Sequence, residues 1–142
     1  MCCKKFLFFL FLISISSQSY GQRNDLWILS TQNSLFFKEG KVGKEVTPDE
    51  AKQMAQLCAL NALAAISLVA DIDQVERIVR VGGFVNGIAG FTSIPPIING
   101  ASELFIKLFG EVNGKHARTA IGVAELPLNS PVEVEVLVAL KN

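Results

Sequence analysis

Several residue types that build metal or cross-linked sites are scarce in this chain of 142 residues. It has a single histidine, His116, and three cysteines, two of which, Cys2 and Cys3, stand at the extreme N-terminus. Zinc sites need several histidine or cysteine ligands at short spacing, so no metal site is predicted. Cys58 lies on an apolar helical stripe and cannot by itself build a disulfide framework, so we expect it in the core. The sequence therefore predicts neither a metal centre nor a cofactor.

An excess of positive charge is also lacking, because the 13 basic residues are matched by 13 acidic ones. No basic stripe or row of aromatic residues stands out, so nucleic acid is not a predicted partner. No apolar run reaches the roughly 20 residues that a membrane-spanning helix needs, so no stable membrane anchor is predicted. Half of the residues are hydrophobic, which is enough for the core of one domain.

The N-terminal segment has the three-part form of a secretory signal peptide. Lys4 and Lys5 form a short basic region, Phe6–Ile13 is a compact apolar run, and small polar residues follow. A buried helix is the alternative interpretation of the apolar run. We expect residues 1–21 to be a leader that is removed after export to the periplasm or the exterior, and residues 22–142 to form the single mature domain.

Apolar periodicity and turn residues predict an alternation of strands and helices in the mature chain. Thr47-Pro48-Asp49-Glu50 combines a capping threonine, a proline at the first helical position and the glutamate of a capping box, so a helix is expected from there. Gly82-Gly83 suggests a bulge, and Gly110 suggests a helix end. The expected strands are 25–30, 35–37, 74–86, 116–127 and 132–138, and the expected helices are 47–69 and 97–109. This order predicts an α+β domain with a mostly antiparallel sheet and two helices on one face.

The last third of the chain carries the residues of greatest chemical interest. Arg118 opens one strand-like run, and Glu133 and Glu135 share one face of the next. Asn129-Ser130-Pro131 is turn chemistry between the two runs, so an antiparallel hairpin is expected. A suitable register would then bring Arg118 near Glu133. The two residues could be an ordinary cross-strand ion pair on a solvated face, or parts of a functional site.

Two groups of motifs carry a resemblance to a known family. Arg118-Thr119 with Leu126-Pro127, followed by Val132-Glu133-Val134-Glu135, resembles the C-terminal signature of the RidA/YjgF family, also called endoribonuclease L-PSP or chorismate-mutase-like. Upstream, the chain is similar to one branch of that family in the following segments: Asn99-Gly100-Ala101-Ser102, Phe109-Gly110-Glu111 and His116-Ala117-Arg118. The resemblance runs from about Asp25 to Leu140. It implies the same α+β fold and a homotrimer with pockets between neighbouring subunits.

The resemblance also implies a chemistry for the arginine and the glutamate. Active members are hydrolases, imine and enamine deaminases that convert small 2-imino or 2-enamino acids to 2-keto acids and ammonia without a cofactor. The family arginine, which corresponds to Arg118, holds the substrate carboxylate. A planar guanidinium suits this role because it can form two charge-assisted hydrogen bonds to a carboxylate. The family glutamate, which corresponds to Glu133, directs the attacking water.

Other pocket positions match the family less closely. Ser30 corresponds to the serine of a Ser-Gly-Gln loop, but Thr31 replaces the glycine. Ser102, with Asn99 close by, corresponds to an asparagine on the second helix. Ala120 stands where many deaminases have a cysteine. Imine hydrolysis needs no protein nucleophile, so Ala120 is compatible with catalysis but makes a changed substrate plausible.

Two functions therefore stay open from the sequence. One is hydrolysis of small imines or enamines, and the other is non-catalytic binding of a small carboxylate in the same cleft. The altered loop and the export signal favour the second. Literal ribonuclease activity is disfavoured because the chain has no histidine pair and no basic groove. His116 is either a structural residue or, because it stands two residues before Arg118, a pocket donor or proton carrier.

Overall fold

The computed structural model describes residues 26–32 and 38–141, and the expected leader and the expected strand 35–37 lie outside them. The order of elements confirms the expected α+β class. The elements are β1 (Leu26–Gln32), α1 (Pro48–Ile66), β2 (Val75–Asn86), α2 (Ile94–Asn113), β3 (Ala117–Val123) and β4 (Val132–Leu140), with short 3-10 turns at Ile72–Gln74 and Pro127–Asn129.

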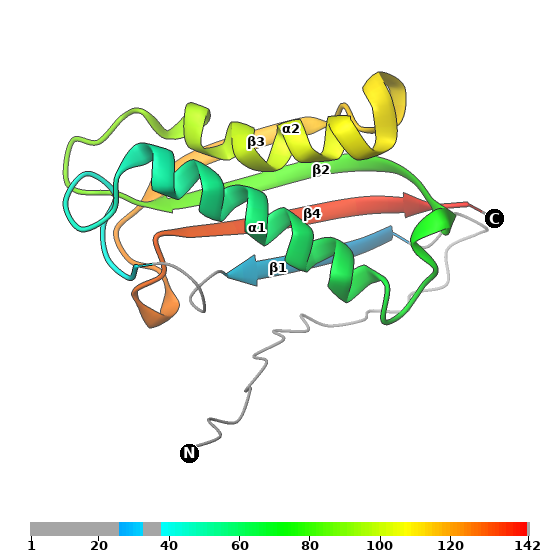
Figure 1. The fold of residues 1–142 in the computed structure, drawn as a ribbon, viewed down its shortest axis with the longest axis horizontal. Coiled ribbons are helices and arrows are strands. Elements are labelled where there is room, and N and C mark those ends of the chain that lie inside the picture. The colour runs from blue at the N-terminus through cyan, green and yellow to red at the C-terminus, as the bar shows by residue number, and fades with distance from the viewer. Residues whose placement is uncertain (1–25, 33–37, 142) are drawn as a thin grey trace, which may run out of the picture.

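The strands form one sheet in the order β1-β4-β2-β3. β4 pairs antiparallel with both β1 and β2, whereas β3 pairs parallel with β2, so the sheet is mostly antiparallel as expected. Both helices lie on the same face of the sheet, side by side (Figure 1). α1 covers β1 and β4, and α2 covers β2 and β3.

The expected hairpin between the last two strands is wrong. β2 lies between β3 and β4, so the two runs are not neighbours. β4 alternates buried valines with half-buried residues and takes a central place where both of its edges are paired. β3 is largely exposed and lies at the edge, reached from β2 through the long α2 crossover that a parallel pair requires. Local turn chemistry at 129–131 could not reveal this order of strands.

Helix α1 begins as the sequence predicts. The Thr47 hydroxyl accepts a hydrogen bond from the Glu50 backbone amide at 3.2 Å, and the Glu50 carboxylate accepts one from the Thr47 amide at 2.9 Å. These reciprocal bonds form the expected capping box and satisfy two amides that a helix start leaves unpaired. The helix ends at Ile66, three residues before the expected end.

The paired glycines of β2 allow close packing and do not mark a bulge. The register shifts lie at Val75/Arg77 and Ile78/Arg80, so the expected bulge at Gly82-Gly83 is wrong. A Cβ atom at Gly83 would stand 2.4 Å from the Ile98 side chain, which means that α2 rests directly on this part of the sheet. Gly110 has φ of 77° and interrupts α2, as expected of a helix end, but one more turn follows to Asn113.

The core lies between the sheet and the two helices, and α1 contributes its alanine-rich face. Cys58 is fully buried there, as predicted, and its thiol lies 3.9 Å from the Val132 carbonyl oxygen. Burial raises the pKa of Cys58 to about 12, so the thiol stays protonated and is not a nucleophile at physiological pH. Within the described residues, no helix is long and apolar enough to cross a membrane.

Candidate functional site

The register of the sheet decides which way Arg118 faces. Arg118 pairs with Val81 of β2, and Val81 pairs with Val136 of β4. Residues paired across adjacent strands project to the same face of a sheet. Val81 and Val136 are fully buried in the core beneath the helices. Arg118 therefore projects from the edge strand toward the helical layer, beside α2.

Two side chains of α2 hold one end of the Arg118 guanidinium. Its Nη1 donates to Asn99 Oδ1 at 2.6 Å and to Ser102 Oγ at 3.4 Å. Both acceptors are neutral, so they orient the cation without cancelling its charge. The structure thus brings together three of the residues that the sequence predicts for the substrate site.

The rest of the guanidinium is available for a ligand. Among the residues the structure describes, Arg118 Nε and Nη2 make no hydrogen bond, and no carboxylate forms an ion pair with Arg118. The residue is exposed. An arginine carries five N–H donors in a planar fork that matches the two oxygens of a carboxylate. The arrangement can therefore bind a small carboxylate at the outer edge of the sheet.

His116 belongs to the same hydrogen-bonded cluster, a role that the sequence left open. Its Nδ1 lies 2.6 Å from the Gly114 carbonyl oxygen, and its Nε2 lies 3.0 Å from Ser102 Oγ. Its ring is nearly perpendicular to that of Phe105, with the two centroids 6.0 Å apart. Burial, with a smaller contribution from the Arg118 charge, lowers the pKa of His116. The imidazole is thus favoured in its neutral form.

Ala120 lies two residues after Arg118 on the same edge strand. It pairs with Gly83, so it also faces the helical layer, and it packs against the core while half-buried. Its methyl group offers the neighbouring site neither a hydrogen bond nor a nucleophile. The structure therefore places this predicted residue beside the arginine, as an apolar wall.

Glu133 is on the other side of the sheet. It pairs with Phe84 of β2, and it alternates along β4 with Val132 and Val134, which are buried beneath the helices. The sheet therefore separates the Glu133 carboxylate from the Arg118 guanidinium within one chain. The expected ion pair between them does not form in a single chain, and neither does a shared site.

Ser30 is also distant from Arg118 within one chain. It stands on β1 and pairs with Glu135 of β4, whereas Arg118 stands on β3 at the opposite edge of the sheet. Two strands lie between them. A single chain thus assembles Arg118, Asn99, Ser102 and Ala120 at one edge and leaves the other two predicted residues elsewhere.

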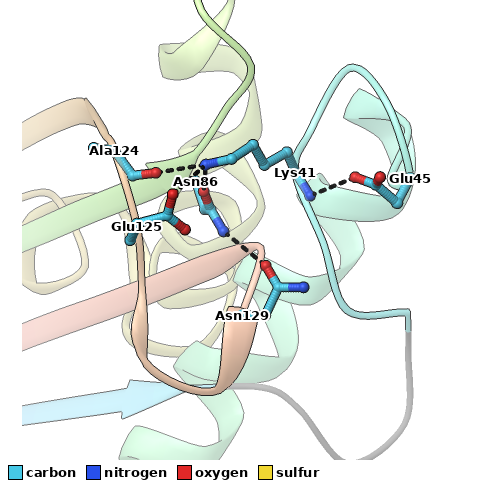
Figure 2. Close-up of polar contacts among 6 residues, drawn as sticks. All are labelled: Lys41, Glu45, Asn86, Ala124, Glu125 and Asn129. Atoms are coloured by element: carbon cyan, nitrogen blue, oxygen red, sulfur yellow. Dashed lines mark hydrogen bonds and ion pairs between the residues drawn. The ribbon is translucent and has the colours of Figure 1, made fainter.

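A second polar cluster surrounds Lys41, and the sequence analysis missed it (Figure 2). Lys41 Nζ donates to Asn86 Oδ1 at 2.7 Å and to the Ala124 carbonyl at 2.5 Å, and it forms an ion pair with Glu125 at 3.3 Å. Asn86 is fully buried, and its amide nitrogen lies 3.5 Å from Asn129 Oδ1. An ammonium has three N–H donors, and all three have partners here. The cluster ties two loops to the end of β2, and the Lys41 ammonium has no donor left for a ligand.

The described residues also lack an obvious metal site. Nowhere in the ranges 26–32 and 38–141 do three or more histidine, cysteine, aspartate or glutamate side chains come close enough to hold an ion.

Comparison with known proteins identifies the fold. A family model described as "YjgF/chorismate mutase-like, putative endoribonuclease" matches residues 23–140. Protein TCP17 of Trypanosoma cruzi is 41% identical over 104 residues, which are 72% of this chain and 65% of that protein, just under two thirds of its length.

Two solved structures have the same fold. Atu1372 of Agrobacterium tumefaciens, a protein of unknown function, is 33% identical with a TM-score of 0.76, covering 84% of this chain and 79% of that one. A structure from Shewanella oneidensis, named a putative endoribonuclease, is 25% identical with a TM-score of 0.75, covering 90% of this chain and 89% of that one. The chain belongs to the YjgF/chorismate mutase-like family, as its motifs predicted.

Proposed function

We propose that this protein binds a small 2-imino or 2-enamino acid through its carboxylate and hydrolyses it to the 2-keto acid and ammonia. The observation that carries the proposal is that most N–H donors of the Arg118 guanidinium are unused. Asn99 and Ser102 hold one nitrogen of its guanidinium, and the other donors have no partner among the described residues. A fixed cation of this kind suits a ligand with a carboxylate next to the reacting carbon.

The reaction is simple enough for such a site. Water adds to the carbon of the C=N bond, the nitrogen takes up the protons, the C–N bond breaks, and ammonia leaves as the C=O bond forms. An enamine follows the same route after its β-carbon takes up a proton. Arg118 orients the substrate and offsets the negative charge next to the carbon that water attacks. No oxidant and no protein nucleophile is required, so Ala120 is compatible with the reaction.

The proposal places Glu133 in the site of a neighbouring copy. Within one chain, the sheet separates Glu133 from Arg118, so a second chain has to supply the carboxylate that directs water. A homotrimer with clefts between subunits would meet this requirement. The same cleft would include Ser30, which stands on the strand at the opposite edge of the sheet from Arg118.

A coupled assay tests the activity directly. An amino-acid oxidase generates 2-iminopropanoate, semicarbazide traps it, and the purified protein competes by hydrolysing it first. We expect the wild-type chain to reduce trapping and Arg118→Ala to lose this effect while keeping its secondary structure and oligomeric state. A folded wild-type assembly that leaves trapping unchanged over several imines would contradict the deaminase proposal.

Mixed assemblies test whether two copies share one site. Arg118→Ala and Glu133→Gln are each expected to be inactive when alone. Co-expressed with different tags and purified as mixed oligomers, they should regain activity, because some clefts then combine an intact Arg118 from one chain with an intact Glu133 from the other. Absence of recovery would show that both residues act from the same chain. Retained activity of Glu133→Gln alone would exclude Glu133 as the residue that directs water.

Binding without turnover is the second candidate function. Two observations favour it: Glu133 is absent from the Arg118 cluster of one chain, and Ala120 adds no reactive group to that cluster. Its signature would be saturable binding of pyruvate or 2-oxobutanoate that is lost in Arg118→Ala, with no hydrolysis of any imine tested.

We also propose that residues 1–21 direct export of the protein. The basic start, apolar run and small polar residues of this segment support the proposal. A reporter fused to residues 1–25 should be exported and cleaved. An uncleaved reporter inside the cell would contradict it.

A further inference from the structure

The hydrogen bonds of His116 fix where its proton lies. A carbonyl oxygen only accepts hydrogen bonds, so the 2.6 Å contact with Gly114 requires the proton on Nδ1. In the neutral ring Nε2 is then bare and accepts. Its partner at 3.0 Å is Ser102, whose hydroxyl must donate to it. Neutral His116 thus takes the only proton that Ser102 has to offer.

Ser102 then has no hydrogen-bond donor left for a carboxylate. Its hydroxyl proton points to His116, and its oxygen accepts from Arg118 Nη1 at 3.4 Å. A hydroxyl has one donor and two acceptor positions, so what remains is a lone pair. A carboxylate bound by Arg118 would meet that lone pair, which repels it. The neutral form of His116 therefore opposes ligand binding at its own cluster.

Protonation of His116 reverses the role of Ser102. Both ring nitrogens then donate, so Ser102 Oγ accepts one bond from His116 Nε2 and one from Arg118 Nη1. Its own proton is released and can be donated to the ligand carboxylate. Every donor and acceptor of the hydroxyl is used in this state, and Arg118 keeps its contact with α2.

Electrostatics acts in the same direction. Burial is the main cause of the lowered pKa of His116, and the Arg118 charge adds to it. From α2 the ring meets Ser102 and Phe105, neither of which is charged, so among the described residues Arg118 is the charged group that acts on His116. A carboxylate bound to Arg118 offsets this charge and favours the imidazolium.

We propose that His116 is a positioning residue which, on taking up a proton, turns Ser102 from a hydrogen-bond acceptor into a donor for the ligand carboxylate. Carboxylate binding is consequently coupled to uptake of a proton. The inference rests on the carboxylate site proposed at Arg118 and assigns to that site a dependence on pH.

Nuclear magnetic resonance of the untagged wild-type protein tests the coupling. His116 is the only histidine of the sequence, so its ring signals are unambiguous. We expect saturating pyruvate to raise the measured pKa of His116 by about one unit, which is equivalent to about tenfold tighter binding to the protonated form. Pyruvate that binds without moving this pKa would overturn the inference. This test needs no substitution, so it does not depend on the folding of a variant.

Calorimetry separates the hydrogen-bond switch from simple attraction of charges. In buffers of different ionisation enthalpy, pyruvate binding to the wild type should show proton uptake and weaken about tenfold as pH rises through the pKa of His116. His116→Asn should lose both effects. Ser102→Ala keeps the histidine but removes the hydroxyl, so most of the increase in pyruvate affinity at low pH should disappear. Proton uptake that persists in His116→Asn would contradict the switch. So would a Ser102→Ala variant whose pyruvate affinity still rises at low pH as much as that of the wild type.

The same titrations separate this inference from the proposed function. Binding that is lost in Arg118→Ala but constant with pH in the wild type would leave the carboxylate site standing and remove the role of His116. Absence of pyruvate binding at every pH would instead contradict the carboxylate site itself.

Discussion

Lys41 and Arg118 are two cations that each contact an asparagine, yet they differ in what they leave unused. The Lys41 ammonium has three acceptors, Asn86, Ala124 and Glu125, for its three N–H donors. Arg118 contacts its partners through one nitrogen, and its other donors face no acceptor in the described part of the chain. A saturated cation holds a fold together, whereas an unsaturated cation can bind a ligand. The number of unused donors, and not the charge, separates the two regions.

The two cations also differ in what they connect. Lys41 joins residues 45 and 83 positions away in the sequence and contacts a fully buried side chain. Within the described part of the chain, the Arg118 side chain forms hydrogen bonds only with α2, to residues 19 and 16 positions away at a partly exposed edge. Loss of Lys41 should therefore affect the stability of the whole domain, and loss of Arg118 should affect ligand binding.

The largest expected effect is on binding when Arg118 is changed. Arg118→Ala should weaken pyruvate binding by at least about 30-fold, because removing one partner of a charged hydrogen-bonded pair costs 2–5 kcal/mol. Arg118→Lys should recover only part of the loss, since an ammonium cannot form the two parallel bonds of a guanidinium. Isothermal calorimetry measures both. If Arg118→Ala unfolds the protein, the residue is structural and the contrast with Lys41 fails.

The opposite result is expected for Lys41. Lys41→Ala leaves the buried amide oxygen of Asn86 without its donor, which should lower the free energy of unfolding by about 1–3 kcal/mol. Urea unfolding followed by circular dichroism measures this change. Pyruvate affinity should be unchanged. Lys44→Ala is the matched control, because Lys44 is an exposed lysine whose ion pair is with its neighbour Glu45, and it should show no measurable change. Equal effects of the two lysines would disprove the structural role of Lys41.

A smaller loss of stability at α1 shows whether destabilisation alone disturbs binding. Thr47→Ala removes the acceptor for the Glu50 amide and should cost about 1 kcal/mol, typical of a lost N-cap. The capping box lies apart from the Arg118 cluster, so pyruvate affinity should stay at the wild-type value. Urea unfolding and calorimetry on the same preparation check both statements. Weakened binding in Thr47→Ala would mean that Arg118 results cannot be read as local effects.

Contacts within one helical turn could be predicted from the sequence, whereas contacts made by the fold could not. The start of α1 was predicted because Thr47 and Glu50 lie within one helical turn, so sequence spacing contains the geometry. The Lys41 cluster could not be predicted, since its partners are brought together only by the fold. The hairpin was wrong for the same reason: a turn at 129–131 says nothing about β2 taking the place between β3 and β4.

The site was predictable in part. The family resemblance gave Asn99, Ser102 and Arg118, and the structure brings them together. Spacing could not show that Glu133 faces the other side of the sheet, because the face of a strand residue depends on register with its neighbours. The histidine two residues before Arg118 was the available signal for a pocket role, and its bonds to Gly114 and Ser102 needed the structure.

The smallest expected effect is on the pH dependence of stability in the unliganded protein. The fold lowers the pKa of His116, so the folded state favours the neutral ring and the unfolded state takes up a proton first as pH falls. The contribution of His116 to the free energy of unfolding is therefore fully present above the ordinary imidazole pKa of about 6.5. It falls as pH drops through that value and stops falling below the pKa of the folded state. The hydrogen bond with Lys38 and those with Thr47 lower the pKa of Glu50 to about 2, so Glu50 also loses stabilising charge below about pH 4.5, but it does so equally in the wild type and in His116→Asn. Urea midpoints on either side of this window should differ less in His116→Asn than in the wild type.

With saturating pyruvate the wild-type difference between these midpoints should also shrink, because the ligand favours the protonated ring. An unchanged difference with ligand would mean that His116 belongs with Lys41 among the residues that only hold the fold together.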